Sequence, residues 1–332
     1  MADKFRKIII SRTDKIGDVV LSLPTFKFLK TRLPSTELIA HVSSYTYPIV
    51  QSSPYVNFII KLEENEPIFN TVKKLRETKA DAILFLYPRA SLSIASYLSG
   101  IPVRAGTAYR WYSFFYNVRV REHRKNAIKS EAEYNLNIAR ALLNEDQATG
   151  LPDFLYADLL KIDSVAESRV NQFLSDMGIH HFVAVHPGSR GSAVNWPMEN
   201  FKSLVEALTK VSGISVILTG SVDERILCEN VRAGNKNAIN TAGLFNLPEL
   251  IALLSKATFL VSNSTGPIHI ASCAGTPVIG LYPNSKPMNP QRWAPIGKDK
   301  IILTPPDGSD VVSKISVEKV LESCKTFLTG KL

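Results

Sequence analysis

The strongest constraint on the fold is an alternation of short apolar runs and helical patterns along almost the whole sequence. The apolar runs are rich in β-branched residues, as in KIIIS (7–11) and SVILTG (215–220). Most of them are followed by a segment with the spacing of an amphipathic helix. Buried strands that alternate with helices indicate parallel sheets wound by right-handed crossovers. The sequence therefore predicts the α/β class.

The alternation falls into two series, separated by residues 145–163. The first series predicts strands at 7–11, 37–43, 57–62, 81–87 and 103–107, and helices at 17–32, 68–79, 91–99 and 130–143. The second predicts strands at 182–188, 215–220, 238–242, 259–264 and 277–283, and helices at 164–177, 198–211, 223–233, 246–257, 266–275 and 316–328. We expect two doubly wound, Rossmann-like domains, 1–160 and 161–332, that face each other across a cleft.

Composition narrows the class of protein further. No apolar run approaches the roughly 18 residues of a membrane span. The N-terminus has no export signal, and the three cysteines show neither disulfide nor zinc spacing, so we expect a cytoplasmic protein. The net charge is +9, and most of the excess lies in residues 104–129, among aromatic side chains. This basic aromatic window favours a phosphorylated lipid, an anionic membrane face or a nucleic acid, or it is a solvated loop.

The loop after the first predicted strand carries two carboxylates. Gly17 allows a tight turn into the helix, and Asp18 follows at or near the helix N-cap. Asp14 precedes the glycine in the same loop. Asp18 is either a helix cap or a catalytic group, and Asp14 a solvated loop residue; local sequence does not decide between these readings.

Two loops of the second series suit a phosphate group. In HPGSRGSAVNWP (186–197), Ser189 and its neighbours offer donors and Arg190 offers a fork-shaped cation. In SNSTGPIHIAS (262–272), Ser264, Thr265 and Gly266 lie where a helix begins, with His269 about one turn further on. The alternatives are an ordinary loop and a satisfied, half-buried histidine.

A third loop of the second series, LTGSVDER (218–225), suits a ribose. An acidic residue after a strand can bind ribose hydroxyls, and Glu224 is the first choice for this role and Asp223 the second. The alternative is that both are ordinary acidic residues at a helix N-terminus. The chain has neither a GxGxxG dinucleotide signature nor a P-loop.

Taken together, the motifs resemble glycosyltransferase family 9, the bacterial lipopolysaccharide heptosyltransferases. They are, in order, RTDKIGDVVLSLP, HPGS…NWPMENF, LTGSVDE, the stretch from Thr241 to Pro283, and RWAP. The resemblance spans nearly the whole chain and implies a GT-B fold and an inverting transfer of heptose from ADP-heptose to the lipopolysaccharide inner core. It implies Asp18 as the general base, with Asp14 shaping the loop.

The resemblance also implies the partners. The nucleotide-sugar would bind at Ser189, Arg190, Glu224, Ser264, Thr265, Gly266 and His269. The acceptor is phosphorylated lipid A with its inner core, at the inner face of the inner membrane. Arg110, Arg119, Arg121 and Arg124 of the basic aromatic window would bind this acceptor, with peripheral membrane contact. No cofactor is expected, and no carboxylate pair suggests a divalent metal.

Two departures from the family pattern touch the donor site. Val194 stands where family members usually carry a phosphate-contacting lysine, so Arg190 or Lys286 would have to substitute. Ser264 stands where many members carry aspartate. Another nucleotide-sugar donor is therefore an alternative, as is a GT-B-type nucleotide-sugar epimerase. A basic nucleic-acid-binding protein is a third reading, but the chain lacks a recognised reading motif, so no nucleic-acid partner is expected.

Overall fold

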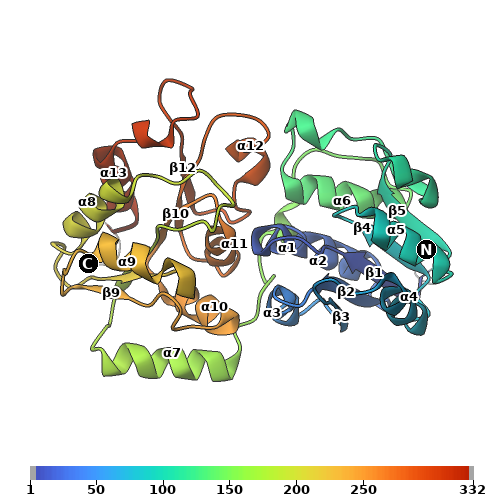
Figure 1. The fold of residues 1–332 in the computed structure, drawn as a ribbon, viewed down its shortest axis with the longest axis horizontal. Coiled ribbons are helices and arrows are strands. Elements are labelled where there is room, and N and C mark those ends of the chain that lie inside the picture. The colour runs from blue at the N-terminus through green and yellow to red at the C-terminus, as the bar shows by residue number, and fades with distance from the viewer. Residues whose placement is uncertain (1–4, 329–332) are drawn as a thin grey trace. The chain divides into compact units, whose positions relative to one another are not determined.

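The structure contains two β-sheets, and the strands within each sheet are parallel (Figure 1). The computed structural model describes residues 5–328. It divides into two compact units, residues 1–160 and 161–332, and the outermost residues of the two predicted domains, 1–4 and 329–332, lie outside the described part. Each unit contains one six-stranded sheet with helices between its strands. The predicted α/β class is confirmed.

The sheet of unit 1 has the order β3-β2-β1-β4-β5-β6. β1 is the central apolar run, and it pairs in parallel with β2 and β4, so that Ile9 lies opposite Ile39 and Ile83. All three side chains are buried. The strands are β1 (Lys7–Ser11), β2 (Glu37–Ser43), β3 (Phe58–Leu62), β4 (Ala82–Phe85), β5 (Val103–Thr107) and β6 (Val118–Val120).

The helices of unit 1 pack in three pairs, α2 with α6, α4 with α5 and α1 with α3. They are α1 (Ile16–Val20), α2 (Leu23–Arg32), α3 (Tyr47–Gln51), α4 (Ile68–Glu77), α5 (Ala90–Leu98) and α6 (Glu131–Leu142), with short 3-10 turns η1 (Trp111–Phe115), η2 (Arg124–Asn126) and η3 (Asp153–Leu155). The prediction of one helix over 17–32 was wrong. Pro24 has no N–H to continue the ladder from α1, so the chain begins a second helix at Leu23.

The sheet of unit 2 has the order β12-β11-β10-β7-β8-β9. Its strands are β7 (Phe182–His186), β8 (Ser215–Leu218), β9 (Ala238–Asn240), β10 (Leu260–Asn263), β11 (Val278–Leu281) and β12 (Lys300–Leu303). Its helices are α7 (Ser164–Asp176), α8 (Met198–Leu208), α9 (Arg225–Arg232), α10 (Leu247–Lys256), α11 (Gly266–Cys273), α12 (Pro290–Trp293) and α13 (Val317–Leu328), with the 3-10 turns η4 (Val222–Glu224) and η5 (Val312–Lys314).

Each sheet has one point at which the strand order reverses. In unit 1 the point lies between β1 and β4, and in unit 2 between β7 and β10. At such a point the loops leave the strands on opposite sides and open a crevice beside the carboxyl ends. The predicted residues Asp18, Ser189, Arg190, Ser264, Thr265 and Gly266 follow β1, β7 and β10, whereas Glu224 follows β8 and the four predicted arginines lie beyond β5.

Candidate active site

A buried guanidinium lies at the switch point of unit 1. Arg12 follows β1 directly, and its side chain is only 2% exposed. Its Nε donates to Asp14 Oδ1 (2.7 Å), and its Nη1 donates to Glu131 Oε1 (2.8 Å), Asn135 Oδ1 (3.1 Å) and the Leu86 carbonyl (3.1 Å). These partners come from the β1–α1 loop, from α6 and from the end of β4. Arg12 therefore ties three elements together at the carboxyl edge of the sheet.

Asp18 is the third residue of α1 and is not its cap. The N-cap position is Lys15, and it forms no side-chain cap, so the reading of Asp18 as a helix cap was wrong. Arg12 Nη2 instead donates to Asp18 Oδ1. The Asp18 side chain is 14% exposed. A carboxylate that is held by one strong donor and reaches the surface is placed to contact a ligand.

Asp14 is not the solvated loop residue that one reading predicted. Its side chain is also 14% exposed, and the Tyr45 hydroxyl donates to its backbone carbonyl (2.9 Å). Burial raises the pKa of Asp14 to about 7, with Asp18 and Glu131 also raising it and Arg12 opposing them. Asp14 therefore changes its charge near neutral pH, beside Asp18.

Arg124 belongs to this cluster rather than to an open acceptor surface. Its Nη1 donates to Glu131 Oε1 and to the Leu86 carbonyl (3.0 Å). The cluster, which we call the Arg12 cluster, contains the side chains of Arg12, Asp14, Asp18, Arg124 and Glu131. It brings three carboxylates together with two guanidinium groups.

Sequence reasoning missed Arg12 and Glu131. Two signals could have found them. Arg12 is a charged residue directly after a buried strand at the switch point. Glu131 and Asn135 are polar residues four positions apart, and therefore on one face, in a helix whose described side chains are almost all buried.

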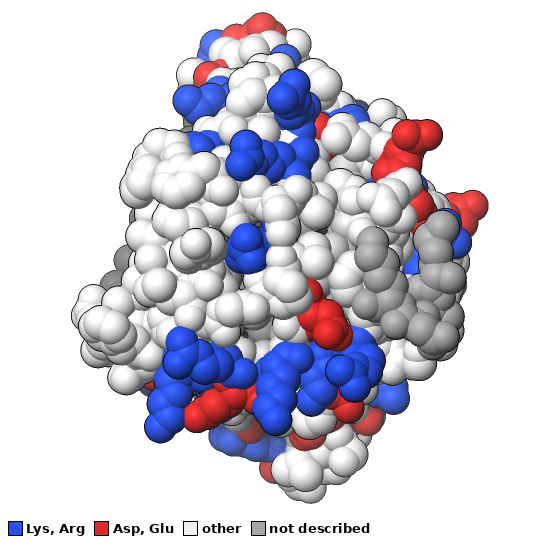
Figure 2. Space-filling view, turned by 90° about the vertical axis from the view of Figure 1, so that its right-hand side faces the viewer, with Lys and Arg blue, Asp and Glu red and all other residues white. Residues whose placement is uncertain are grey.

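The other basic residues of the basic aromatic window lie outside the cluster. Arg110, Arg119 and Arg121 are exposed, and Arg119 also donates from Nε to the Tyr116 carbonyl (2.8 Å). Trp111 and Phe114 of η1 are 72% and 60% exposed. On the face of unit 1 drawn in Figure 2, basic side chains gather in groups separated by largely uncharged surface. Large exposed aromatic side chains beside cations mark a surface that suits a lipid or a partner.

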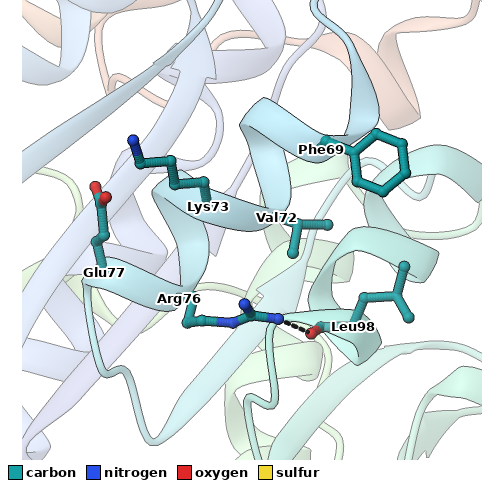
Figure 3. Close-up of a pocket in the computed structure, with 6 residues that line it drawn as sticks. All are labelled: Phe69, Val72, Lys73, Arg76, Glu77 and Leu98. Atoms are coloured by element: carbon teal, nitrogen blue, oxygen red, sulfur yellow. Dashed lines mark hydrogen bonds between the residues drawn. The ribbon is translucent and has the colours of Figure 1, made fainter.

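An apolar pocket on the same unit lies between α4 and α5 (Figure 3), and none of its lining residues belongs to the Arg12 cluster. Phe69 and Val72 of α4 and Leu98 of α5 contribute its apolar lining. The Arg76 side chain extends from α4 toward α5 and donates from Nη2 to the Leu98 carbonyl (2.8 Å). The pocket contains no paired catalytic groups, and we do not assign the reaction to it.

In unit 2, Asn263 holds the loop after β7 against the end of β10. Its Nδ2 donates to the Pro187 carbonyl (2.9 Å), and its Oδ1 accepts from the Trp196 N–H (2.9 Å). Trp196 is buried and donates from Nε1 to the Ile315 carbonyl (2.8 Å). The NWP motif therefore anchors the loop in the core, while residues between Pro187 and Trp196 are left to form the edge of the site.

Glu224 holds the same loop from the other side. Its Oε1 accepts from the Arg190 N–H (3.1 Å), and its Oε2 accepts from the N–H and hydroxyl of Ser221 (2.9 and 3.0 Å). Burial would raise the pKa of Glu224, but the hydrogen bonds from Ser221, the nearby His186 and the Arg190 N–H together hold this pKa below its usual value. Glu224 is therefore an anionic brace behind the loop.

The exposed side of this loop carries the predicted cation. The backbone of Arg190 is in the left-handed region (φ 47°), followed by Gly191 (φ 71°). The Arg190 side chain is 67% exposed, and its Nη2 lies 3.8 Å from Asp223 Oδ2. Ser189 is buried and donates from Oγ to the Ala193 carbonyl (3.1 Å). The guanidinium of Arg190 is thus presented to solvent on a braced loop.

The start of α11 supplies backbone donors next to this loop, because β10 and β7 are neighbours. Thr265 is the N-cap, in extended conformation and without a side-chain cap, and its Oγ1 lies 3.1 Å from Ser262 Oγ. Ser264 and Gly266 flank it. The first N–H groups of a helix and its dipole favour an anion.

His269 lies one turn into α11 and is buried. Burial lowers its pKa to about 4, with Lys300 lowering it further, so the imidazole is neutral at pH 7. Its Nδ1 has no hydrogen-bond partner among the described residues. One alternative was a half-buried histidine with its hydrogen bonds made. His269 is instead buried, and its Nδ1 makes no hydrogen bond with the described residues.

The part of the chain that the structure describes offers neither a metal cluster nor a membrane-spanning helix. No group of three or more His, Cys, Asp or Glu side chains within residues 5–328 could hold a metal ion. No helix within that range has the length and apolar character needed to cross a bilayer.

Two doubly wound units, each with polar loops at its switch point, define the architecture of a GT-B glycosyltransferase. The fold matches the structure of Escherichia coli ADP-heptose lipopolysaccharide heptosyltransferase II with a TM-score of 0.80 and 21% identity, over 97% of this chain and 98% of that one. The profile of glycosyltransferase family 9 (heptosyltransferase) matches residues 68–319. The chain belongs to this family and is a glycosyltransferase, which confirms the resemblance.

Relatives of known description span nearly the same length. A Haemophilus influenzae protein described only as a presumed glycosyltransferase is 28% identical, over 97% of this chain and 96% of its own. The lipopolysaccharide core heptosyltransferase OpsX of the same organism is 27% identical, over 87% of this chain and 82% of its own. The relationship therefore covers both units.

Proposed function

We propose that this protein transfers heptose from ADP-heptose to the inner core of lipopolysaccharide, with inversion at the anomeric carbon. The family and the descriptions of its relatives support heptose transfer in lipopolysaccharide synthesis. The observation that carries the mechanism is the Asp18 carboxylate, which lies at the switch point of unit 1, held by Arg12 and still open to solvent.

In the proposed reaction Asp18 is the general base of a single displacement. The acceptor hydroxyl gives its proton to Asp18 while its oxygen bonds to the anomeric carbon of heptose. The bond from that carbon to the diphosphate oxygen breaks at the same time, and ADP leaves. A carboxylate is a weak base for a sugar hydroxyl, so it acts as the developing bond makes that proton acidic.

The larger contribution to the rate would come from binding the leaving diphosphate. Arg190, whose guanidinium is exposed, and the start of α11 at Ser264, Thr265 and Gly266 are the groups proposed to bind it. Ser189 and Glu224 would shape the loop that carries Arg190, and His269 would support the α11 turn from inside. These groups supply positive charge and N–H donors, so the proposal assigns no step to a divalent metal or other cofactor.

The acceptor would bind through exposed basic residues of unit 1. Arg110, Arg119 and Arg121 are exposed, and their cations suit the phosphates of lipid A and its core. Arg124 would act indirectly, through Glu131. We also propose peripheral contact with the inner face of the inner membrane, with Trp111 and Phe114 entering its interface. Sedimentation with anionic vesicles, compared with neutral ones, checks that contact.

The identity of the nucleotide is the sharpest test of this function against its rivals. A ligand raises the melting temperature of the protein that binds it. ADP and ADP-heptose should raise it, whereas UDP and UDP-sugars at equal concentration should leave it unchanged. A shift with UDP alone would contradict heptose transfer and favour a UDP-sugar enzyme of the same fold, with an epimerase as the main candidate.

A further inference from the structure

The fork of the Arg12 guanidinium is divided between two carboxylates. The Nε–H and one Nη–H of an arginine point the same way, and together they match both oxygens of a single carboxylate. In this protein Nε donates to Asp14 Oδ1 (2.7 Å), and Nη2 donates to Asp18 Oδ1. Each aspartate therefore gives one oxygen to Arg12. Asp18 Oδ2 accepts no hydrogen bond from any of residues 5–328.

This division has a consequence for the proton acceptor. If Arg12 held Asp18 with both prongs, both oxygens of Asp18 would be occupied by donors, and the carboxylate would be a poor base. Asp14 occupies the Nε prong and keeps Arg12 from closing on Asp18. On the other side of the guanidinium, Nη1 donates to Glu131 and Asn135. These two hydrogen bonds fix the orientation of Arg12.

We propose that Asp14 is a positioning residue, which shares the Arg12 fork so that one oxygen of Asp18 stays free to take the acceptor's proton. The inference rests on the proposed function of Asp18 as the base. It assigns to Asp14 a role in the reaction, where the sequence alone assigned it only the shape of the loop. Its effect on Asp18 has two parts, one steric through the Nε prong and one electrostatic through its negative charge.

The charges around Asp14 come from three elements. Arg12 follows β1, Asp18 is in α1, and Glu131 begins α6; the Tyr45 hydroxyl, from the loop after β2, faces the Asp14 carbonyl. Burial raises the pKa of Asp14 to about 7. Above this pH Asp14 is ionised and shares the positive charge of Arg12. Below it Asp14 is protonated, and the charge of Arg12 is shared only between Asp18 and Glu131.

The test is a series of variants at position 14, with kcat measured from about pH 5 to pH 9 around that titration. Asp14→Asn keeps an oxygen for the Nε prong but removes the charge, and we expect a fall in kcat of roughly tenfold at pH 8. Asp14→Ala frees the prong, and we expect a larger fall, of roughly 10²-fold. Asp14→Glu restores a carboxylate and should recover part of the loss.

The pH profile separates this role from a structural one. In the wild type, kcat should fall as the pH drops through about 7, because Asp14 becomes protonated. In Asp14→Asn that titration should be absent, because position 14 then carries no carboxyl group to lose or gain a proton. ADP affinity, measured by calorimetry, should be unchanged in every variant.

Two results would overturn the proposal. One is a wild-type kcat and pH profile in both Asp14→Asn and Asp14→Ala. The other is an equal loss of activity and melting temperature in all three variants, Asp14→Glu included, with an unshifted profile. Failure of the function itself gives a different result, because Asp18→Asn would then remain fully active whatever position 14 contains.

Discussion

At the scale of single residues, the Arg12 cluster depends on Glu131. Glu131 is 1% exposed, and it accepts from both Arg12 Nη1 and Arg124 Nη1. A buried ion pair contributes little net stability compared with apolar residues, but removal of one partner leaves a charge without compensation. In this cluster Arg12 and Arg124 would lose the buried carboxylate that they share, and Asp14 and Asp18 would remain on Arg12. Glu131 therefore matters more for stability than its pairwise contacts suggest.

We predict that Glu131→Gln lowers the free energy of unfolding by about 3 kcal/mol. Glu145→Gln is the matched control, because Glu145 pairs with Arg32 at the surface, where both side chains are at least one third exposed. This control should change stability by less than about 1 kcal/mol. Urea denaturation measures both. Equal stability of the two variants would show that the cluster does not depend on the Glu131 charge.

At the scale of elements, periodicity predicted most strands and helices, because each buried strand and amphipathic helix carries its own pattern. Periodicity did not predict β6 or β12. β6 has only three residues and lies within the basic aromatic window, and β12 is a four-residue strand at the edge of its sheet. It also joined α1 and α2, because the apolar spacing continues past Pro24.

The candidate site was harder to predict than its elements. Asp18, Arg190 and the α11 turn each come within a few residues of the end of a strand, so topology alone placed them at the carboxyl edge. The partners of Arg12 could not be predicted this way, because Glu131 is 119 positions away and Asn135 is 123 positions away. The contact between Arg124 and Glu131 could not be predicted either, because the burial of Glu131 depends on the same distant elements.

The loop after β7 depends on a glycine, Gly188, to which the sequence analysis gave no role. A Cβ atom at Gly188 would lie 2.0 Å from Glu224 Oε1, closer than any real contact. Glu224 braces the loop through the Arg190 N–H, so its displacement would move Arg190. The absence of a side chain at position 188 thus allows the brace to reach the loop.

We predict that Gly188→Ala weakens ADP binding by at least roughly tenfold, or 1.4 kcal/mol, because the Arg190 loop moves. Gly213→Ala is the control: Gly213 has a φ of +76° with open space around its Cβ position, so alanine there costs about 1 kcal/mol of strain. Gly213 lies outside the proposed site. Calorimetric titration with ADP measures both. Equal ADP affinity in the two variants would contradict the role given to this loop.

At the scale of the whole molecule, the two units carry complementary chemistry. Unit 1 presents a carboxylate held by a buried arginine, and unit 2 presents an exposed arginine beside the N–H groups of a helix start. A proton acceptor alone or a diphosphate site alone would serve many enzymes. Their combination in a chain of family 9 is what supports the proposed reaction.

The most direct test of this account is the release of ADP from ADP-heptose by the Asp18→Asn variant in the presence of acceptor. Removal of the base should lower kcat by roughly 10²-fold or more, while the calorimetric affinity for ADP-heptose stays within about twofold of wild type. The matched control is Asp176→Asn, an exposed carboxylate at the end of α7 that lies outside the proposed site. Wild-type turnover by Asp18→Asn would contradict the central claim that this carboxylate takes the acceptor's proton.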